Sequence, residues 1–332
     1  MSNTKSTNSP FLSIVIPCYN VAEYLPDTIQ SLSQLSDAAD CEFIFVNDGS
    51  TDETLAFIQD FAKRDSRVVL LQQQNAGVSA ARNAALQEAK GQYVLPVDGD
   101  DRLLPDAIST IRHAIQGSDL LIAPVQILDH GKLIRTTLPF ADGNYTPYTL
   151  FRACKLFPTN PKLVYKAGII KAHNLRFNEF IHCGEVLAFT CAFLSHCQTI
   201  AVSHHGFYQY VMRDTSAIHA ANFPKDATVL HIVESITKTT DSSIRALPSF
   251  NATLFRICTS FTYNKYAKEG LLDDSALTVV KQVVQHTGLR HCAWLLVRSV
   301  GYYGKDRFMA LYMLVTGVWG YKLLARVFRL RK

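Results

Sequence analysis

The sequence has few of the features that mark a disulfide-bonded, zinc-binding or secreted protein. Its eight cysteines include no C-x-x-C pair and lie mostly within apolar runs, which predicts buried, reduced thiols. The histidines and cysteines between residues 182 and 205 fit no common zinc-ligand spacing. No charged segment followed by an apolar one opens the chain, so we expect no signal peptide, and residues 1–10 are predicted to be a flexible leader. These absences favour a cytoplasmic protein.

Glycine-rich phosphate-binding signatures are missing as well. Neither G-x-G-x-x-G nor G-x-x-x-x-G-K-[ST] occurs, which argues against a dinucleotide-dependent enzyme and against a P-loop nucleotidase. The net charge of +5 comes from residues 290–332, where nine Lys and Arg accompany a single acid, Asp306. Because these basic residues are confined to a tail rather than spread over the main domain, we expect no nucleic-acid partner.

What the 332 residues do contain is a regular alternation of apolar runs and helical segments. An apolar fraction of 48% with 18% charged residues is that of a folded globular protein. Apolar, β-branched runs predict strands at 11–17, 41–47, 67–71, 93–97 and 119–125, with helices between them. Asn20 with Glu23, and Ser50 with Glu53, have the spacing of helix-capping boxes. Strand and helix in alternation predict an α/β fold whose mainly parallel sheet has helices on both faces.

A short acidic stretch, DGDD, follows the fourth predicted strand. Residues i and i+2 of an extended segment project to the same side, so Asp98 and Asp100 are expected to face one point, with Gly99 leaving the backbone uncovered. Two convergent carboxylates suit a hard divalent cation, and such a cation suits a diphosphate. The alternative is an acidic turn that is merely solvated.

Other polar motifs also follow predicted strands. Residues 17–20 come after the first strand, residues 47–50 after the second and residues 98–101 after the fourth. In an open parallel sheet ligands bind beyond the carboxyl ends of the strands. The three motifs are therefore predicted to lie on one rim and to form one ligand site.

Four segments carry a resemblance to a known family. In this order and spacing, SIVIPCYN, FIFVNDGSTDET, NAGVSAARNAAL and GQYVLPVDGDD resemble the donor-binding half of a family 2 glycosyltransferase of the GT-A fold. The resemblance covers residues 11–105 and continues more weakly to about residue 219. It implies a catalytic domain at 11–220, with a donor half at 11–125 and an acceptor half at 126–220. It also implies a nucleotide-sugar donor, usually a uridine one.

The resemblance implies a role for each matching residue. The base and ribose pocket would be lined by Pro17, Tyr19 and Asn20. Asp48 would accept a hydrogen bond from the base, although an aspartate there is also a natural cap for the following loop and helix. Arg82 would approach the donor. Of the D-x-D pair, Asp98 would reach the ribose, and Asp100 together with Asp98 would hold the cation, Mn²⁺ or Mg²⁺.

The catalytic base is where the chain departs from the family pattern. The family places a Glu-Asp pair before an apolar helix, and FNEFIHCGEVLAF keeps Glu185 but has Val186 in place of the aspartate. We assign the base to Glu185, and Glu179 in the preceding loop is the other candidate. The alternative is a catalytically weak nucleotide-sugar-binding or scaffold protein on the same fold.

The remaining segments are assigned more coarsely. YQYVMRDTS resembles the family's segment that closes over the diphosphate, with Arg213 as the predicted contact and His219 as a weaker candidate. Residues 129–132 are predicted to form a hairpin turn. Residues 145–157 are expected to shape the pocket of the acceptor, a glycan or a lipid-linked molecule of cell-surface polysaccharide synthesis.

The C-terminal third contains two further predicted regions. Apolar residues at helical spacing predict a helical appendage at 221–289. Residues 308–321 are uncharged, but as a helix they would reach only ~21 Å, short of the ~30 Å hydrocarbon core. With its tryptophans, tyrosines and basic residues, the 290–332 tail is predicted to lie on the inner face of the cell membrane. The alternative is a helix packed on the appendage.

Overall fold

The computed structural model describes residues 9–153, 161–181 and 184–212, and beyond them residues 232, 234–236, 238–247 and 250. By its internal contacts the chain forms two compact units, residues 1–146 with 159–221, and residues 147–158 with 222–332. The predicted 290–332 tail lies outside the described residues, as does most of the appendage at 221–289. The predicted domain boundaries therefore stay predictions.

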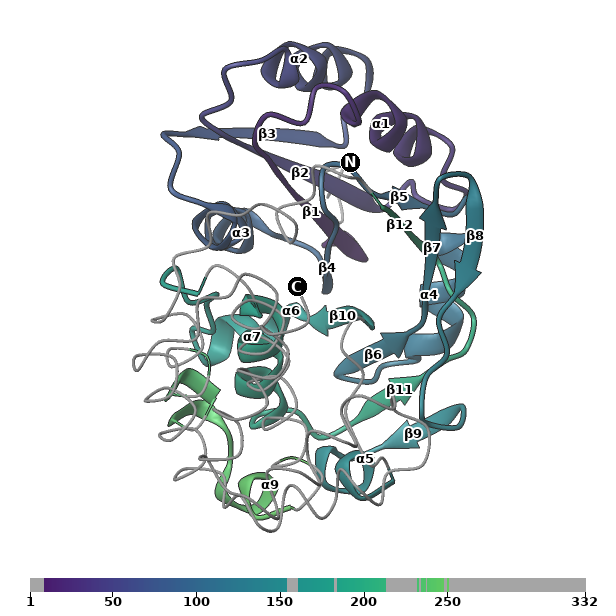
Figure 1. Cartoon of the computed structure of the whole chain (residues 1–332), viewed down its shortest axis with the longest axis vertical. Coiled ribbons are helices and arrows are strands. Elements are labelled where there is room, and N and C mark those ends of the chain that lie inside the picture. Colours follow the sequence, from purple (N-terminus) through teal and green to yellow (C-terminus); the bar gives the residue numbers. More distant parts are fainter. Residues whose placement is uncertain are drawn as a thin grey trace, which may run out of the picture. The chain divides into compact units, whose positions relative to one another are not determined.

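An eight-stranded sheet of order β3-β2-β1-β4-β10-β6-β11-β9 is the framework of the first unit (Figure 1). Its strands are β1 Leu12–Cys18, β2 Cys41–Asp48, β3 Val68–Gln73, β4 Tyr93–Pro96, β6 Leu120–Ala123, β9 Gly143–Tyr145, β10 Lys162–Lys166 and β11 Ile200–Val202. The strands β3, β2, β1 and β4 pair in parallel, as predicted. β10 is antiparallel to both of its neighbours, β4 and β6, so a late segment of the chain completes the middle of the sheet.

The apolar runs of β1 and β2 are buried along their whole length, as expected for strands covered on both faces. One face packs against α1 Leu25–Ser33, α2 Thr54–Arg64 and α4 Ala107–Ile115, with Ile14, Phe43 and Ile111 among the core side chains. On the other face, α3 Val78–Glu88 lies against β1 and β2. α6 Ala167–Ala172 follows β10, and α7 Glu185–Leu194 places two phenylalanine rings edge-on to Tyr165 of β10. Helices thus cover both faces, as predicted.

The two predicted capping boxes are wrong. α1 begins at Leu25 and α2 at Thr54, and neither has a side-chain cap. Asn20 instead adopts a left-handed conformation (φ 50°), and its Oδ1 accepts the N–H of Thr51 at 2.8 Å. The Oγ of Ser50 accepts the N–H of Asn20 at 3.1 Å. These side chains have been recruited to join the loops after β1 and β2, so they are not available to cap the helices that follow.

A second sheet of order β5-β12-β7-β8 lies in the same unit (Figure 1). Its strands are β5 Arg102–Leu103, β12 Tyr208–Val211, β7 Val125–Asp129 and β8 Lys132–Arg135. The predicted hairpin at 129–132 is confirmed, because β7 and β8 pair antiparallel around His130 (φ 45°) and Gly131 (φ 81°). Positive φ at both central positions is the geometry of the tight turn that suits the twist of paired strands.

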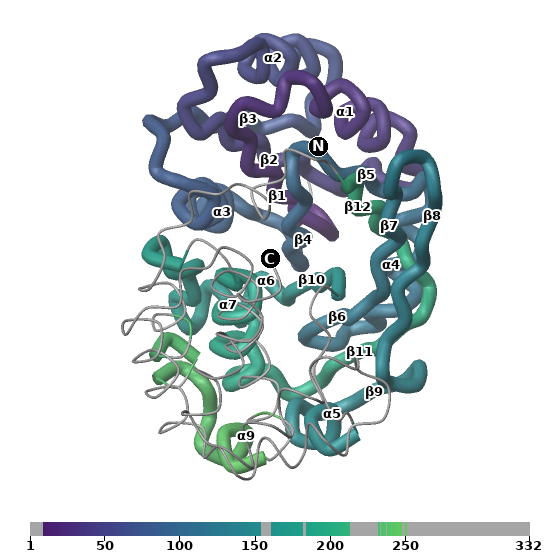
Figure 2. Tube along the Cα trace, viewed as in Figure 1, coloured from purple at the N-terminus to yellow at the C-terminus, as the bar shows by residue number. Residues whose placement is uncertain are grey.

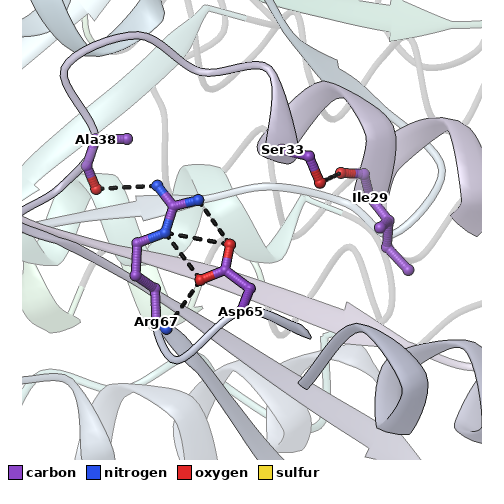
Figure 3. A network of polar contacts seen from close by, with 5 residues as sticks. All are labelled: Ile29, Ser33, Ala38, Asp65 and Arg67. Atoms are coloured by element: carbon purple, nitrogen blue, oxygen red, sulfur yellow. Dashed lines mark hydrogen bonds and ion pairs between the residues drawn. The ribbon is translucent and has the colours of Figure 1, made fainter. Parts of the chain in front are cut away.

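At the opposite end of the main sheet from the polar rim, Arg67 fixes the start of β3 (Figure 3). Its guanidinium binds Asp65 at 2.6 Å (Nη2 to Oδ2) and the carbonyl of Ala38 at 3.1 Å, and lies 4.6 Å from the ring centroid of Phe43. The hydrogen bonds from Arg67 hold the pKa of the Asp65 carboxyl below its usual range.

In the second unit, the described elements are α5 Pro147–Ala153 and α9 Ser242–Arg245 (Figure 2). The ring of Phe151 lies edge-on to that of Phe250, with 5.5 Å between the ring centroids. Among the described residues, none of the helices combines the length and apolar character needed to cross a bilayer.

Candidate active site

The three polar motifs lie on one rim of the main sheet, as predicted. β2, β1 and β4 are adjacent and parallel, so residues 17–20, 47–50 and 98–101 leave the sheet at the same edge. β10 runs in the opposite direction, and its first residue, Lys162, therefore lies at this rim as well. The topology brings together side chains that are far apart in the sequence.

The acidic stretch at 98–101 is a tight turn and not an extended segment. It is closed by the N–H of Asp101, which donates to the carbonyl of Asp98 at 3.0 Å. Gly99 is buried, and a Cβ there would lie 2.9 Å from Sγ of Cys18 and 3.1 Å from the carbonyl oxygen of Pro17. The predicted extended geometry and uncovered backbone are therefore wrong. Glycine is needed because the turn packs against the end of β1.

A buried arginine, Arg82, joins two other predicted site residues, Asp98 and Glu185. Arg82 of α3, with a side chain only 6% exposed, places Nη2 2.8 Å from Oδ1 of Asp98 and Nη1 2.7 Å from Oε1 of Glu185. Burial by itself would lower the pKa of Arg82, but the two carboxylates outweigh this effect and raise it. One cation thus bridges two carboxylates from different elements.

The third carboxylate of the turn is fixed to the second sheet. Asp101 is 1% exposed, and it accepts the hydroxyl of Tyr208 at 2.5 Å and the N–H of Val211 at 2.9 Å. The same hydroxyl accepts the N–H of Asp98 at 3.3 Å. Burial and then the negative charge of Asp98 raise the pKa of Asp101 to about 7. Asp101 therefore anchors the turn to β12, a role that sequence reasoning did not assign.

Lys162 is the other residue that sequence reasoning missed. Lys162 is the first residue of β10 and is partly exposed. Its Nζ lies 3.4 Å from the ring centroid of Tyr208. Burial lowers the pKa of Lys162 to about 8, against the opposing charges of Asp98 and Asp101. A lysine in a run such as KLVYK carries no local sign of function, because only the long-range pairing of β10 with β4 places it beside the turn.

Asp48 binds the loop before α3, and not the loop and helix that directly follow it in the sequence. Its carboxylate accepts Gln73 Nε2 at 2.7 Å and the N–H groups of Ala76 and Gly77, each at 2.9 Å, just before α3. Asp48 is 3% exposed. These three bonds fill three of the about four acceptor positions of a carboxylate. The contact with a nucleotide base stays a prediction.

The rest of the predicted donor pocket lies along the same rim. Pro17 is buried in β1, whereas the ring of Tyr19 is 48% exposed and Asn20 is exposed at the loop beyond it. Asp100 lies partly exposed in the acidic turn. Arg213 and His219 lie outside the described residues.

The two candidate bases lie in different surroundings. Glu185 is the first residue of α7, after Gly184 in a left-handed conformation (φ 85°), and it shares Arg82 with Asp98. Glu179 is exposed, and its Oε1 accepts Asn83 Nδ2 at 2.9 Å. Only Glu185 is connected to the acidic turn through hydrogen bonds that the structure describes. Val186, next to it, is partly buried and apolar.

The residues of the turn fit a substrate-dependent cation site. Among the described residues, no three His, Cys, Asp or Glu side chains gather as a preformed metal cage. Mg²⁺ and similar ions are usually held by one or two carboxylates plus substrate phosphates, which is what Asp98 and Asp100 could provide.

Comparison with known proteins agrees with this geometry. Residues 13–164 match the model of Glycosyl transferase family 2. These residues are thus similar to a family 2 glycosyltransferase domain. This domain contains β1, β2, β4 and the Arg82 and Asp98 parts of the network, and it ends within β10.

Several curated proteins are similar to this chain. The uncharacterized glycosyltransferase EpsJ of Bacillus subtilis is 28% identical over 60% of this chain and 61% of its own length. Poly(ribitol-phosphate) beta-glucosyltransferase of Bacillus spizizenii is 28% identical over 65% of this chain and 34% of its own length. The chain thus spans less than two thirds of the length of these relatives.

Solved structures share the fold. The Staphylococcus aureus TarS 1–349 structure in complex with UDP-GlcNAc has a TM-score of 0.74 at 18% identity, covering 97% of this chain and 92% of that one. The mannosyltransferase PcManGT of Pyrobaculum calidifontis, in complex with GDP-Man and Mn²⁺, has a TM-score of 0.56 at 13% identity, covering 96% and 87%. The predicted GT-A fold is confirmed.

Proposed function

We propose that this family 2 chain is an inverting, metal-dependent glycosyltransferase of cell-surface polysaccharide synthesis. It moves a sugar from a nucleotide-diphosphate donor, a UDP-sugar, to a hydroxyl of a glycan or lipid-linked acceptor. The observation that carries the proposal is the Arg82 bridge, which joins Asp98 of the acidic turn to Glu185 of α7. The UDP-GlcNAc complex of TarS and the glucosyltransferase named for poly(ribitol-phosphate) support the donor and acceptor classes.

On the donor side, Asp98 and Asp100 would hold Mn²⁺ or Mg²⁺ beside the diphosphate. When bound, the cation stabilises the negative charge that the departing nucleoside diphosphate acquires. Pro17, Tyr19 and Asn20 bind the nucleoside in this proposal, and the exposed ring of Tyr19 offers a surface for the base. Arg213, outside the described residues, is proposed to close over the diphosphate.

On the acceptor side, Glu185 is the proposed base. Arg82 binds its Oε1, which leaves Oε2 to take the proton of the attacking hydroxyl. The oxygen of that hydroxyl forms the new bond to the anomeric carbon as the bond to the diphosphate breaks, and the electron pair of the broken bond leaves with the diphosphate. One base is enough for inversion, because no covalent intermediate is formed.

The test is a screen of nucleotide sugars for release of nucleoside diphosphate, with and without Mn²⁺. Asp100→Ala should lower kcat/KM about 10²–10³-fold, the usual cost of losing an electrostatic contact to the transition state. Glu185→Gln should lower kcat by about 10²–10⁴-fold while leaving the donor KM nearly unchanged.

Glu179→Gln is the matched control for the base, because Glu179 lies outside the Arg82 network. A larger loss in Glu179→Gln than in Glu185→Gln would transfer the role of base to Glu179. Full activity in Asp100→Ala would remove the proposed metal role.

Val186 supports a second candidate function, a nucleotide-sugar-binding or scaffold protein. The family's aspartate is replaced by an apolar side chain, and Glu185 is already engaged by Arg82. Donor binding by calorimetry without turnover toward any acceptor would favour this function over the first.

We also propose that the 290–332 tail holds the enzyme on the inner face of the cell membrane. Its nine basic residues suit anionic lipid, and its aromatic residues suit the headgroup layer. Deleting residues 290–332 should move the protein from the membrane to the soluble fraction, and unchanged partitioning would contradict the proposal.

A further inference from the structure

Lys162 is a cation beside the acidic turn, and the mechanism proposed above assigns it no role. Within the described part of the chain its ammonium forms no hydrogen bond, although Lys carries three donors. Its contact there is with the face of the Tyr208 ring, 3.4 Å from Nζ to the centroid. Because Lys162 is only partly exposed, its charged group would be stabilised by a ligand that supplies a hydrogen-bond acceptor.

The support beneath Lys162 is rigid. The hydroxyl of Tyr208 is bound to both Asp101 and the backbone of Asp98, so the ring under Nζ is fixed to the acidic turn. Lys162 itself is held in β10 by its pairing with Ala123 of β6. The position of Lys162 relative to residues 98–101 is therefore set by the backbone pairing of β10 and by the side-chain contacts of Tyr208.

The charges on the two sides of the turn are complementary. On the α3 side, the positive charge of Arg82 is shared by two carboxylates, Asp98 and Glu185. On the β10 side, Asp101 is satisfied by Tyr208 and Val211, which leaves the charge of Lys162 without a hydrogen-bonded partner in the described residues. A ligand that reaches the turn from the β10 side would meet the positive charge of Lys162.

We propose that Lys162 binds the diphosphate of the nucleotide donor, donating a hydrogen bond to a phosphate oxygen beside the acidic turn. This inference rests on the proposed function and adds a residue to it. As the sugar–oxygen bond breaks, its electron pair moves onto the terminal phosphate, and Lys162 stabilises that charge without transferring a proton. Lysine is well suited to this role because its ammonium acts as a point charge toward phosphate.

The experiment compares the binding of UDP and of uridine to the full-length protein by calorimetry, in the presence of Mn²⁺. The variants are Lys162→Met, Lys162→Arg and, as a control on the same strand, Lys166→Met, whose ammonium is paired with Asp119 at 2.9 Å. We expect Lys162→Met to lower the affinity for UDP about tenfold or more and to leave the affinity for uridine unchanged. Lys162→Arg should recover most of the affinity, and Lys166→Met should bind both ligands as the wild type does.

The ratio of the two affinities within one variant guards against a folding defect, since a misfolded protein would lose UDP and uridine together. Thermal unfolding of each variant is measured alongside. Equal weakening of UDP and uridine in a folded Lys162→Met protein, or none, would overturn the role of Lys162. A wild type that binds neither ligand would instead overturn the proposed function on which this inference rests.

Discussion

The acidic turn is held in two different ways on its two sides. Toward α3, Asp98 is held by a side chain, the guanidinium of Arg82, which it shares with Glu185. Toward the second sheet, Asp101 is held by Tyr208 and by a backbone N–H of β12. In the first arrangement one guanidinium joins two carboxylates from different elements. In the second arrangement each oxygen of Asp101 accepts a hydrogen bond from β12. Asp98 and Asp101, three residues apart, therefore bind different parts of the structure.

The largest effect is expected from removing Arg82, which holds the α3 side of the turn. Arg82→Met would leave Asp98 and the largely buried Glu185 without their shared counter-charge, and breaking a buried ion pair typically costs about 3–5 kcal/mol. We expect a lower midpoint of urea unfolding and loss of sugar transfer.

Arg67→Met is the matched control for Arg82, because Arg67 also binds a carboxylate and lies over a phenylalanine ring, but at the opposite end of the sheet. It should lower stability less and leave transfer intact. Equal loss of transfer in the two variants would show that the Arg82 bridge has no special role.

On the other side of the turn, Tyr208→Phe should have a smaller effect. It removes the hydroxyl that Asp101 accepts and that receives the N–H of Asp98, and an unsatisfied buried polar group costs about 1–3 kcal/mol. Stability should fall measurably in urea unfolding, while sugar transfer should fall less than in the Arg82 variant. Tyr210→Phe, two residues along β12, serves as the control. If Tyr208→Phe lowered sugar transfer as much as Arg82→Met, the two sides of the turn would not differ in function.

The smallest effect on sugar transfer is expected at Asp119, which lies away from the rim. Burial would raise the pKa of Asp119, but the N–H groups of Gln198 and Thr199 and the ammonium of Lys166 lower it below its ordinary value of 3.8. A carboxyl whose pKa is depressed by folding stabilises the protein above its unfolded pKa, and this stabilisation is lost as the pH falls.

Asp119→Asn should therefore lower the free energy of unfolding by about 1–3 kcal/mol at pH 7, with a difference from wild type that shrinks below pH 4. Urea unfolding at pH 7, 5 and 3 measures it, and transfer at pH 7 should be unchanged. A difference that is constant with pH would mean that the charge of Asp119 contributes nothing.

The sequence predicted the parts of the fold and site that depend on local patterns. The buried runs of β1 and β2, the rim at residues 17–20, 47–50 and 98–101, and the hairpin at 129–132 each follow from short-range periodicity and turn chemistry. The roles assigned to Arg82, Asp98 and Glu185 followed from the family resemblance, and their bonding through one guanidinium became visible only in the structure.

The missed features all depend on contacts between distant residues. Asp101 is paired with Tyr208, 107 positions away, and Lys162 reaches the turn through the insertion of β10 between β4 and β6. The capping boxes failed for the same reason, since Asn20 and Ser50 had better partners across the rim than within their own segments. Local propensity cannot show that a tertiary partner competes for a side chain.

The place of β10 has a consequence for how the chain is made. During synthesis the strands β1 to β4 emerge first and can pair among themselves, but the outer edge of β4 gains its partner only when residues 162–166 have appeared. At about 5–20 residues per second, that edge stays open on the nascent chain for seconds. An unpaired strand edge is a template for wrong pairing. A ribosome-bound chain that ends near residue 150 should therefore depend on chaperones more than one that includes residue 170.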